Sequence, residues 1–239
     1  MIASVVRLLL PNACVACGRA VESRTPDALV CAVCTSRLEP VRPGCSRCAQ
    51  PLPPIGACRF CADWPPALRE VRSAAWLTAA ARAMAHHLKY DDYRSLADAM
   101  ARVMRRELPR PDAGVLVPIP VSPRKLRLRG YNQAALIAVE LGKLWDLPVR
   151  EDLLRRAKDT GTQTALTADA RLANVAAAFA AQRPAPGLPV PVIIVDDVLT
   201  TGATLRAAAS ALQAAEWEHI TAVTFARALT YDRRALANQ

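Results

Sequence analysis

The sequence predicts an α/β protein in which a small cysteine-rich module precedes a parallel sheet flanked by helices. All eight cysteines lie within the first 61 of the 239 residues, so the chain changes character after its first quarter. Beyond residue 67, short apolar runs alternate with helical patterns, an order typical of a parallel sheet whose crossovers are helices. The chain is longer than one usual domain, and we expect a module over residues 1–66 and a larger domain over residues 67–239.

Strands are predicted where a short run of apolar and β-branched residues is bounded by polar, glycine or proline positions. The expected strands are residues 71–77, 115–120, 192–195 and 219–226. Helices are predicted where apolar residues recur every three or four positions, as Leu96, Met100 and Val103 do. The expected helices are an alanine-rich one beginning over residues 79–88, followed by residues 95–108, 132–144 and 205–215.

The cysteines form four CxxC pairs, and each pair places two sulfurs on one turn of the chain. Two such pairs, separated by roughly 10 to 20 residues, supply the four thiolates of a tetrahedral zinc site, so the sequence predicts two zinc ions. The pairs combine either sequentially or in a cross-braced arrangement. Disulfides and redox chemistry are disfavoured, because we expect no secretory signal and because the motif is repeated four times. The predicted ligands are Cys14, Cys17, Cys31, Cys34, Cys45, Cys48, Cys58 and Cys61.

Residues 192–204 read VIIVDDVLTTGAT, which is a buried strand followed by two carboxylates and a turn of small residues. A helical pattern follows at once, so the amides and hydroxyls of residues 200–204 are expected to converge on one point at a helix N-terminus. Such a junction is a phosphate cradle. Asp196 and Asp197 would repel a second phosphate, which favours sugar hydroxyls or a phosphate-bound metal as their partners. The alternative is that these residues only cap the helix.

Residues 122–133, SPRKLRLRGYNQ, follow the predicted strand over residues 115–120 and precede a predicted helix. Arg124, Lys125 and Arg129 make this junction strongly cationic and therefore suited to a polyanion. A solvated basic face is the alternative. Residues 155–179 are polar at first and helical only near Ala168, and we expect a mobile flap whose Gln163, Arg171 and Asn174 face the site.

The run over residues 192–204 resembles the signature of the type I phosphoribosyltransferases, which recognise 5-phosphoribosyl 1-pyrophosphate (PRPP). The resemblance implies a phosphoribosyltransferase-like parallel sheet and Mg²⁺ bound together with PRPP. It also implies that Asp196 and Asp197 hold the ribose hydroxyls. By the same resemblance, Arg124, Lys125 and Arg129 form the pyrophosphate loop. The residues implied for the loop that binds the 5-phosphate are Thr200, Thr201, Gly202, Ala203 and Thr204.

Three motifs taken together resemble the ComF family of bacterial competence-associated proteins over nearly the whole chain. They are RxLRxRGYNQ, TxxQxxLxxxxRxxNVxxAF and VDDVLTTGAT, preceded by the paired CxxC motifs. This resemblance implies a PRPP-binding fold fused to a double zinc ribbon, with a role in handling single-stranded DNA during natural transformation. It does not imply catalysis. The alternative is an active phosphoribosyltransferase that moves ribose 5-phosphate from PRPP to a nucleobase or amine and releases pyrophosphate.

The composition bears on the partners. A formal net charge of +10 favours a polyanion, whereas an aromatic content of 5% makes a base-stacking platform unexpected. We expect no membrane span, because no apolar run approaches the required length of about 18 residues. A cytoplasmic location and contacts with other competence proteins are further expectations. His86 and His87 are expected to be a surface feature, since no nucleophile accompanies them.

Overall fold

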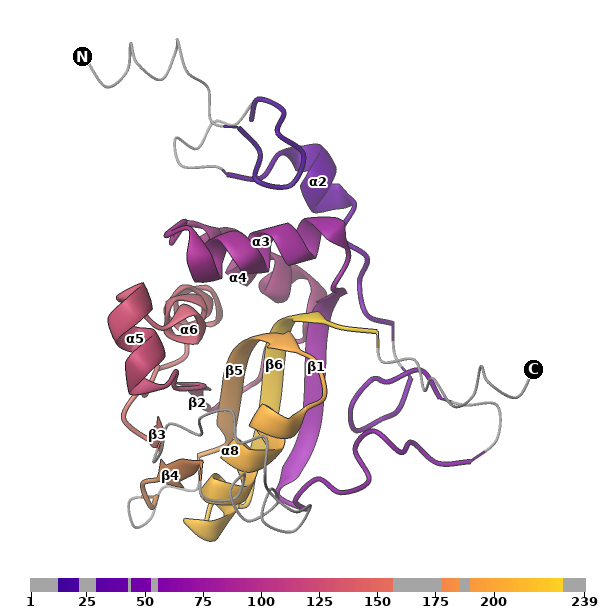
Figure 1. Ribbon diagram of the computed structural model, residues 1–239. Coiled ribbons are helices and arrows are strands. Elements are labelled where there is room, and N and C mark those ends of the chain that lie inside the picture. Colours follow the sequence, from indigo (N-terminus) through magenta and orange to yellow (C-terminus); the bar gives the residue numbers. More distant parts are fainter. Residues whose placement is uncertain are drawn as a thin grey trace, which may run out of the picture.

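The computed structural model describes residues 13–21, 29–42, 44–52, 56–156, 178–184 and 190–229. At its centre is a four-stranded sheet in the order β1-β6-β5-β2, and every neighbouring pair is parallel (Figure 1). The predicted fold class, a parallel sheet flanked by helices, is thus confirmed. The strands are β1 (Leu68–Trp76), β2 (Val115–Pro118), β5 (Val192–Leu199) and β6 (Ile220–Arg227).

Helices cover both faces of the sheet, as the uninterrupted apolar strands require. Along β5, Ile193 and Val195 pack with the helices of one face, whereas Val192 and Ile194 pack with α8 on the other. Each face therefore has its own hydrophobic core. The helices of the first face are α3 (Ala79–Tyr90), α4 (Leu96–Glu107) and α6 (Gln133–Trp145), and the helix of the second is α8 (Ala203–Ala214).

Strand β5 does not end at Val195, as the sequence analysis expected, but runs on through both aspartates to Leu199. The reason is its pairing with β6, because Asp196 lies opposite Thr224 and Leu199 lies opposite Arg227. Backbone hydrogen bonding to a neighbouring strand has overridden the low strand propensity of aspartate. The acid pair is consequently held on a rigid strand instead of a loop.

The basic segment is also more regular than expected, because Pro123–Arg129 forms a short helix, α5, where a loop was predicted. Ser122 caps it by accepting a hydrogen bond from the amide of Lys125, and proline occupies the first helical position. Gly130 ends the helix with φ of 79°, a left-handed conformation that suits glycine. These three signals are present in the sequence and explain the difference.

The segment predicted as a flap is bordered by a two-stranded antiparallel hairpin of β3 (Leu154–Arg156) and β4 (Phe179–Ala181), which the sequence analysis did not predict. Leu154 and Phe179 bury it in the core that contains α8. Gln163, Arg171 and Asn174 lie outside the described residues. None of the described helices is long and apolar enough to cross a lipid bilayer.

The cysteine-rich segment is packed against the sheet domain. Between its two halves, the chain runs beside β1, where the amide of Val41 donates to the carbonyl of Ala74 and the amide of Trp76 donates to the carbonyl of Glu39. The first half, with the short helix α2 (Ala32–Ser36), lies over α3, and the second half lies beside β1 (Figure 1). Cys48 and Cys61 of the second half belong to the core on the α8 face.

Candidate functional site

A cavity of about 410 Å³ lies at the carboxyl end of β5. Helices α3, α5 and α8 supply much of its wall, as expected for a ligand site at the carboxyl edge of a parallel sheet. Its lining is unusually rich in charge. The predicted site residues that line the cavity are Lys125, Arg129, Asp196, Asp197, Thr200 and Thr204.

Four predicted site residues do not line this cavity: Arg124, Thr201, Gly202 and Ala203. Lys125 and Arg129 lie four positions apart and share a face of α5, whereas Arg124 projects from another side. Gly202 instead packs against the indole ring of Trp64. Within the described residues, the structure therefore brings together the two acids, two threonines and two of the three predicted cations.

The two acids sit in a hydrogen-bonded network. Asp197 is 2% exposed, and its Oδ2 atom forms an ion pair with Nζ of Lys89 at 2.5 Å. Its Oδ1 atom accepts a hydrogen bond from Nε2 of Gln133 at 3.4 Å, and Gln133 in turn accepts one from Arg129. Helices α3 and α6 thereby orient Asp197, and α5 is linked to it through one glutamine.

Asp196 has no cation of its own among these contacts. Its Oδ1 atom accepts a hydrogen bond from the amide of Asp197 at 2.9 Å, and the residue is buried. Burial, together with the neighbouring charge of Asp197, raises the pKa of Asp196 well above its ordinary value. The site therefore holds a carboxyl group whose charge is costly until a cation or a hydrogen-bond donor arrives.

Sequence reasoning missed the contribution of α3. Arg82, His86 and Lys89 recur at helical spacing and line the same cavity as Thr200 and Thr204. The signal was present, because positions i, i+4 and i+7 share one face of a helix. The sequence did not show that this face of α3 points towards the aspartates and not towards solvent.

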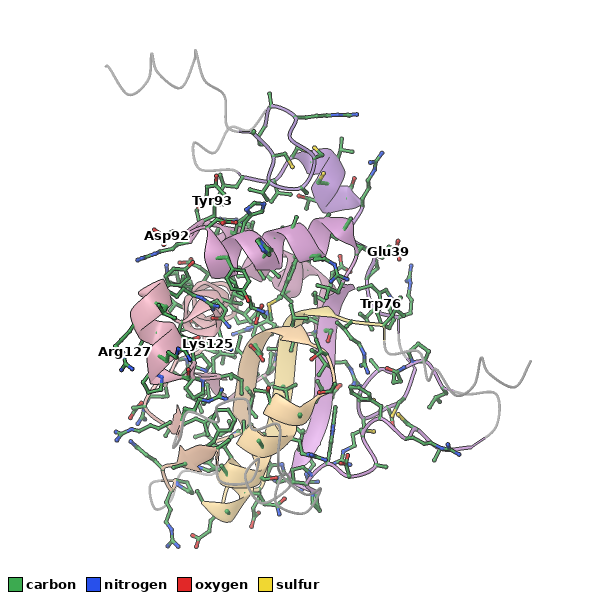
Figure 2. All side chains as sticks on the ribbon, viewed as in Figure 1. Glu39, Trp76, Asp92, Tyr93, Lys125 and Arg127 are labelled. Atoms are coloured by element: carbon green, nitrogen blue, oxygen red, sulfur yellow. The ribbon has the colours of Figure 1, made fainter. Side chains whose placement is uncertain are left out.

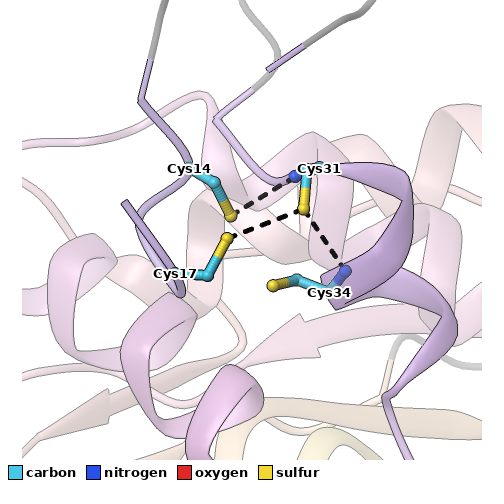
Figure 3. Close-up of side chains that lie close together, drawn as sticks. All are labelled: Cys14, Cys17, Cys31 and Cys34. Atoms are coloured by element: carbon cyan, nitrogen blue, oxygen red, sulfur yellow. Dashed lines mark hydrogen bonds between the residues drawn. The ribbon is translucent and has the colours of Figure 1, made fainter. Parts of the chain in front are cut away.

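The cysteines form two separate clusters with sequential pairing, so the cross-braced alternative is not observed. The first consists of Cys14, Cys17, Cys31 and Cys34 (Figure 3), and the second of Cys45, Cys48, Cys58 and Cys61. In each cluster the four sulfurs lie within 4.8 Å of one another. Zn–S bonds of about 2.3 Å in a tetrahedron place sulfurs roughly 3.8 Å apart.

The sulfur separations fit that geometry. The Sγ atoms of Cys17 and Cys31 lie 3.9 Å apart, and those of Cys48 and Cys58 lie 3.6 Å apart. All eight thiols are free, so disulfides do not account for the clustering. Each cluster therefore supplies the closed four-cysteine ligand set of one structural zinc ion.

The second cluster is joined to α8 and to β6 of the sheet domain. Asp63, two residues after Cys61, forms an ion pair with Arg206 in the first turn of α8. Arg227, at the end of β6, is completely buried and donates to the carbonyl of Cys48. Burial lowers the pKa of Arg227, and the neighbouring cysteines of the second cluster offset this shift only in part.

Comparisons with known proteins agree with this two-part organisation. A double zinc ribbon domain matches residues 5–62, and a phosphoribosyl transferase domain matches residues 190–237. The chain is 31% identical over 223 residues to the DNA utilization protein YhgH of Salmonella typhi, and the aligned region covers 86% of this chain and 92% of that protein.

Two further relatives carry competence names. The chain is 29% identical over 204 residues to Competence protein ComFC of Bacillus subtilis, covering 81% of this chain and 82% of that protein. It is 35% identical over 114 residues to Competence protein F of Haemophilus influenzae, covering 47% of this chain and 50% of that protein.

Proposed function

Because this chain belongs to the ComF family, we propose that it binds PRPP with Mg²⁺ in the cavity at the carboxyl end of β5 and handles single-stranded DNA. One observation carries the first half of the proposal. A single cavity joins a pair of buried acids to threonines at the start of α8 on one side and to Lys125 and Arg129 on another. Two anion-binding places separated by carboxylates match a ligand with two phosphorylated ends and hydroxyls between them.

The proposed contacts follow from the chemistry of each part. Thr200 and Thr204 line the cavity at the N-terminus of α8, where free amides and the helix dipole favour the 5-phosphate. Lys125 and Arg129 are proposed to hold the pyrophosphate. The remaining predicted loop residues, Thr201, Gly202 and Ala203, would contribute through the backbone of the turn that begins the helix.

Asp196 and Asp197 are proposed to accept hydrogen bonds from the ribose hydroxyls. A divalent cation also fits this place, because two adjacent carboxylates supply hard oxygen ligands and, within the described residues, Lys89 forms the one ion pair recorded for them. When bound with PRPP, Mg²⁺ would neutralise phosphate charge. Lys89 would meanwhile hold Asp197 in place through their ion pair before the sugar arrives.

The second half of the proposal rests on the relatives and on charge. One relative is named a DNA utilization protein and two are named competence proteins, and a net charge of +10 suits a polyanionic partner. We therefore place the protein in the cytoplasm, on the path of incoming single-stranded DNA and beside other competence proteins. A flap containing Gln163, Arg171 and Asn174 remains a prediction.

Calorimetry with Mg-PRPP tests the site directly. The double substitution Asp196→Asn and Asp197→Asn should abolish binding, because each side chain loses its negative charge and exchanges one acceptor oxygen for an NH₂ donor. Asp98→Asn is the matched control, since it removes an exposed carboxylate from α4 that pairs only with Arg102. If the double variant keeps its fold in circular dichroism and binds Mg-PRPP with unchanged affinity, the site assignment is wrong.

The alternative function is transfer of ribose 5-phosphate to a nucleobase or amine. It is favoured by the cavity volume of about 410 Å³, which lies within the range of small-molecule sites. Arg82 and His86 of α3 also line this cavity, and the PRPP assignment gives them no role. Incubating the protein with Mg-PRPP and a panel of bases distinguishes the two functions. Release of pyrophosphate with one base would establish a transferase, whereas tight binding without release would favour the binding role.

A further inference from the structure

Two of the tyrosines gather at the end of α3, although the low aromatic content of the chain made a stacking platform unexpected. Tyr90 is 67% exposed and Tyr93 is 42% exposed. Each lies against a histidine of α3, with ring centroids 4.9 Å apart for His86 and Tyr90 and 5.5 Å apart for His87 and Tyr93. Two large rings therefore have neighbours that help to hold them while both remain exposed to solvent.

Cations lie beside these rings. The guanidinium of Arg129 lies 5.4 Å from the ring centroid of Tyr90. That of Arg94 lies 4.6 Å from the centroid of a third ring, Tyr131, which is buried and is not itself open for stacking. Helix α5 carries four cations and no acid. Arg124, Lys125 and Arg127 form no ion pair within the described residues. Figure 2 shows Tyr93 at the end of α3 and Arg127 on α5 along the same edge of the molecule.

The two acids in this region do not cancel that charge. Asp92 is bound by Arg94 at 2.7 Å, and an oxygen of Asp91 lies 2.7 Å from Nδ1 of His87. The net positive charge of this part of the surface therefore comes from the cations of α5. Exposed rings beside a run of cations are the composition of surfaces that bind single-stranded nucleic acid, where bases stack on aromatic rings and phosphates meet arginine and lysine.

We propose that this surface, formed by Tyr90, Tyr93 and Arg94 with the cations of α5, is where the protein binds single-stranded DNA. Base stacking needs unpaired bases, so the surface discriminates against duplex DNA. Stacking on a ring is tolerant of sequence, so no base preference is expected. The inference rests on the proposed function, because it names the surface for the proposed DNA partner. This surface shares Tyr90, Lys125 and Arg129 with the cavity.

The test separates stacking from charge. The affinity of the full-length protein for a fluorescent oligothymidylate is measured by anisotropy at several salt concentrations. Tyr93→Ala should weaken binding about tenfold without changing the salt slope, because it removes a ring and no charge. Tyr93→Phe should retain the affinity. Arg127→Gln should reduce the slope of log K against log salt by about 0.7, because one phosphate contact is lost.

The matched control is Arg105→Gln, which removes one exposed charge from α4 away from this surface and should leave both quantities unchanged. Tyr93 does not line the cavity, so Tyr93→Ala should bind Mg-PRPP as the unaltered protein does. If Tyr93→Ala leaves the oligothymidylate affinity unchanged and Arg127→Gln leaves the salt slope unchanged, the proposed binding surface is wrong. The proposed DNA function would still stand. Equal affinity for a duplex of the same length would overturn base stacking. No binding by the unaltered protein would reject the DNA function itself.

Discussion

The indole ring of Trp64 lies against Gly202, at the point where the predicted phosphate loop turns into α8. A Cβ atom built on Gly202 would lie 3.1 Å from Cζ2 of Trp64, and Gly202 itself has φ of 77°. Trp64 is 5% exposed and follows Cys61 of the second cluster by three residues. The second zinc ribbon thus forms the outer support of the loop that we propose for the 5-phosphate.

Gly202→Ala should destabilise the protein by about 1–3 kcal/mol, because alanine is strained at positive φ and its methyl group would crowd the ring. Urea denaturation measures the loss, and calorimetry should show weaker binding of Mg-PRPP. Gly130→Ala is the matched control, since φ is 79° there and the nearest atom is 3.7 Å away on the flexible side chain of Arg94. Equal losses in the two variants would show that the contact with Trp64 contributes nothing.

The two zinc ribbons should differ in their effect on the site. Cys58→Ser should lower the zinc content by one ion per chain and weaken Mg-PRPP binding, because the second cluster is joined to α8 and β6 through Asp63 and Arg227. Cys17→Ser should lower the zinc content equally yet leave binding intact, since no contact of the first cluster with the cavity is observed in the described residues. Metal analysis and calorimetry on both variants make the comparison. Loss of binding in both would indicate general unfolding.

The core of the site was predictable because its signals are local. Residues 192–204 contain a strand, two acids and a helix start in one continuous run, so neighbouring residues alone indicate a phosphate cradle. The cysteine clusters were equally predictable from CxxC spacing. Only the choice between sequential and cross-braced pairing needed the structure, because both have the same spacing.

What the sequence could not provide depends on packing between distant segments. Lys89 reaches Asp197, 108 positions further along the chain, and Trp64 meets Gly202 only because the second ribbon folds onto α8. Periodicity identifies the basic face of α3 but not its neighbour. The prediction of a loop at α5 was wrong for a different reason. Ser122, Pro123 and Gly130 are helix signals, but the cations between them favoured an interpretation as a binding loop.

Asp196→Asn should stabilise the protein free of ligand at neutral pH. The pKa of this buried carboxyl is raised above its ordinary value of 3.8, so the folded state holds the proton more tightly than the unfolded state. The carboxyl therefore costs no stability below about pH 4, and the cost grows as the pH rises towards the folded-state pKa. The melting temperature of the variant should exceed that of the unaltered protein at pH 7, and the difference should vanish near pH 4. A difference that is constant with pH would contradict this reasoning.

The ion pair between Lys89 and Asp197 should show strong energetic coupling. Lys89→Met leaves a carboxylate that is 2% exposed without its cation, and we expect a loss of about 2 kcal/mol. Asp197→Asn should cost less, because the side chain of Lys89 is 25% exposed and water can solvate its ammonium. The double variant should be more stable than the sum of the two losses implies, with a coupling energy of roughly 1–3 kcal/mol in urea denaturation. Additive losses would show that Lys89 does not stabilise the charge of Asp197, and its proposed part in orienting that acid would then have to be abandoned.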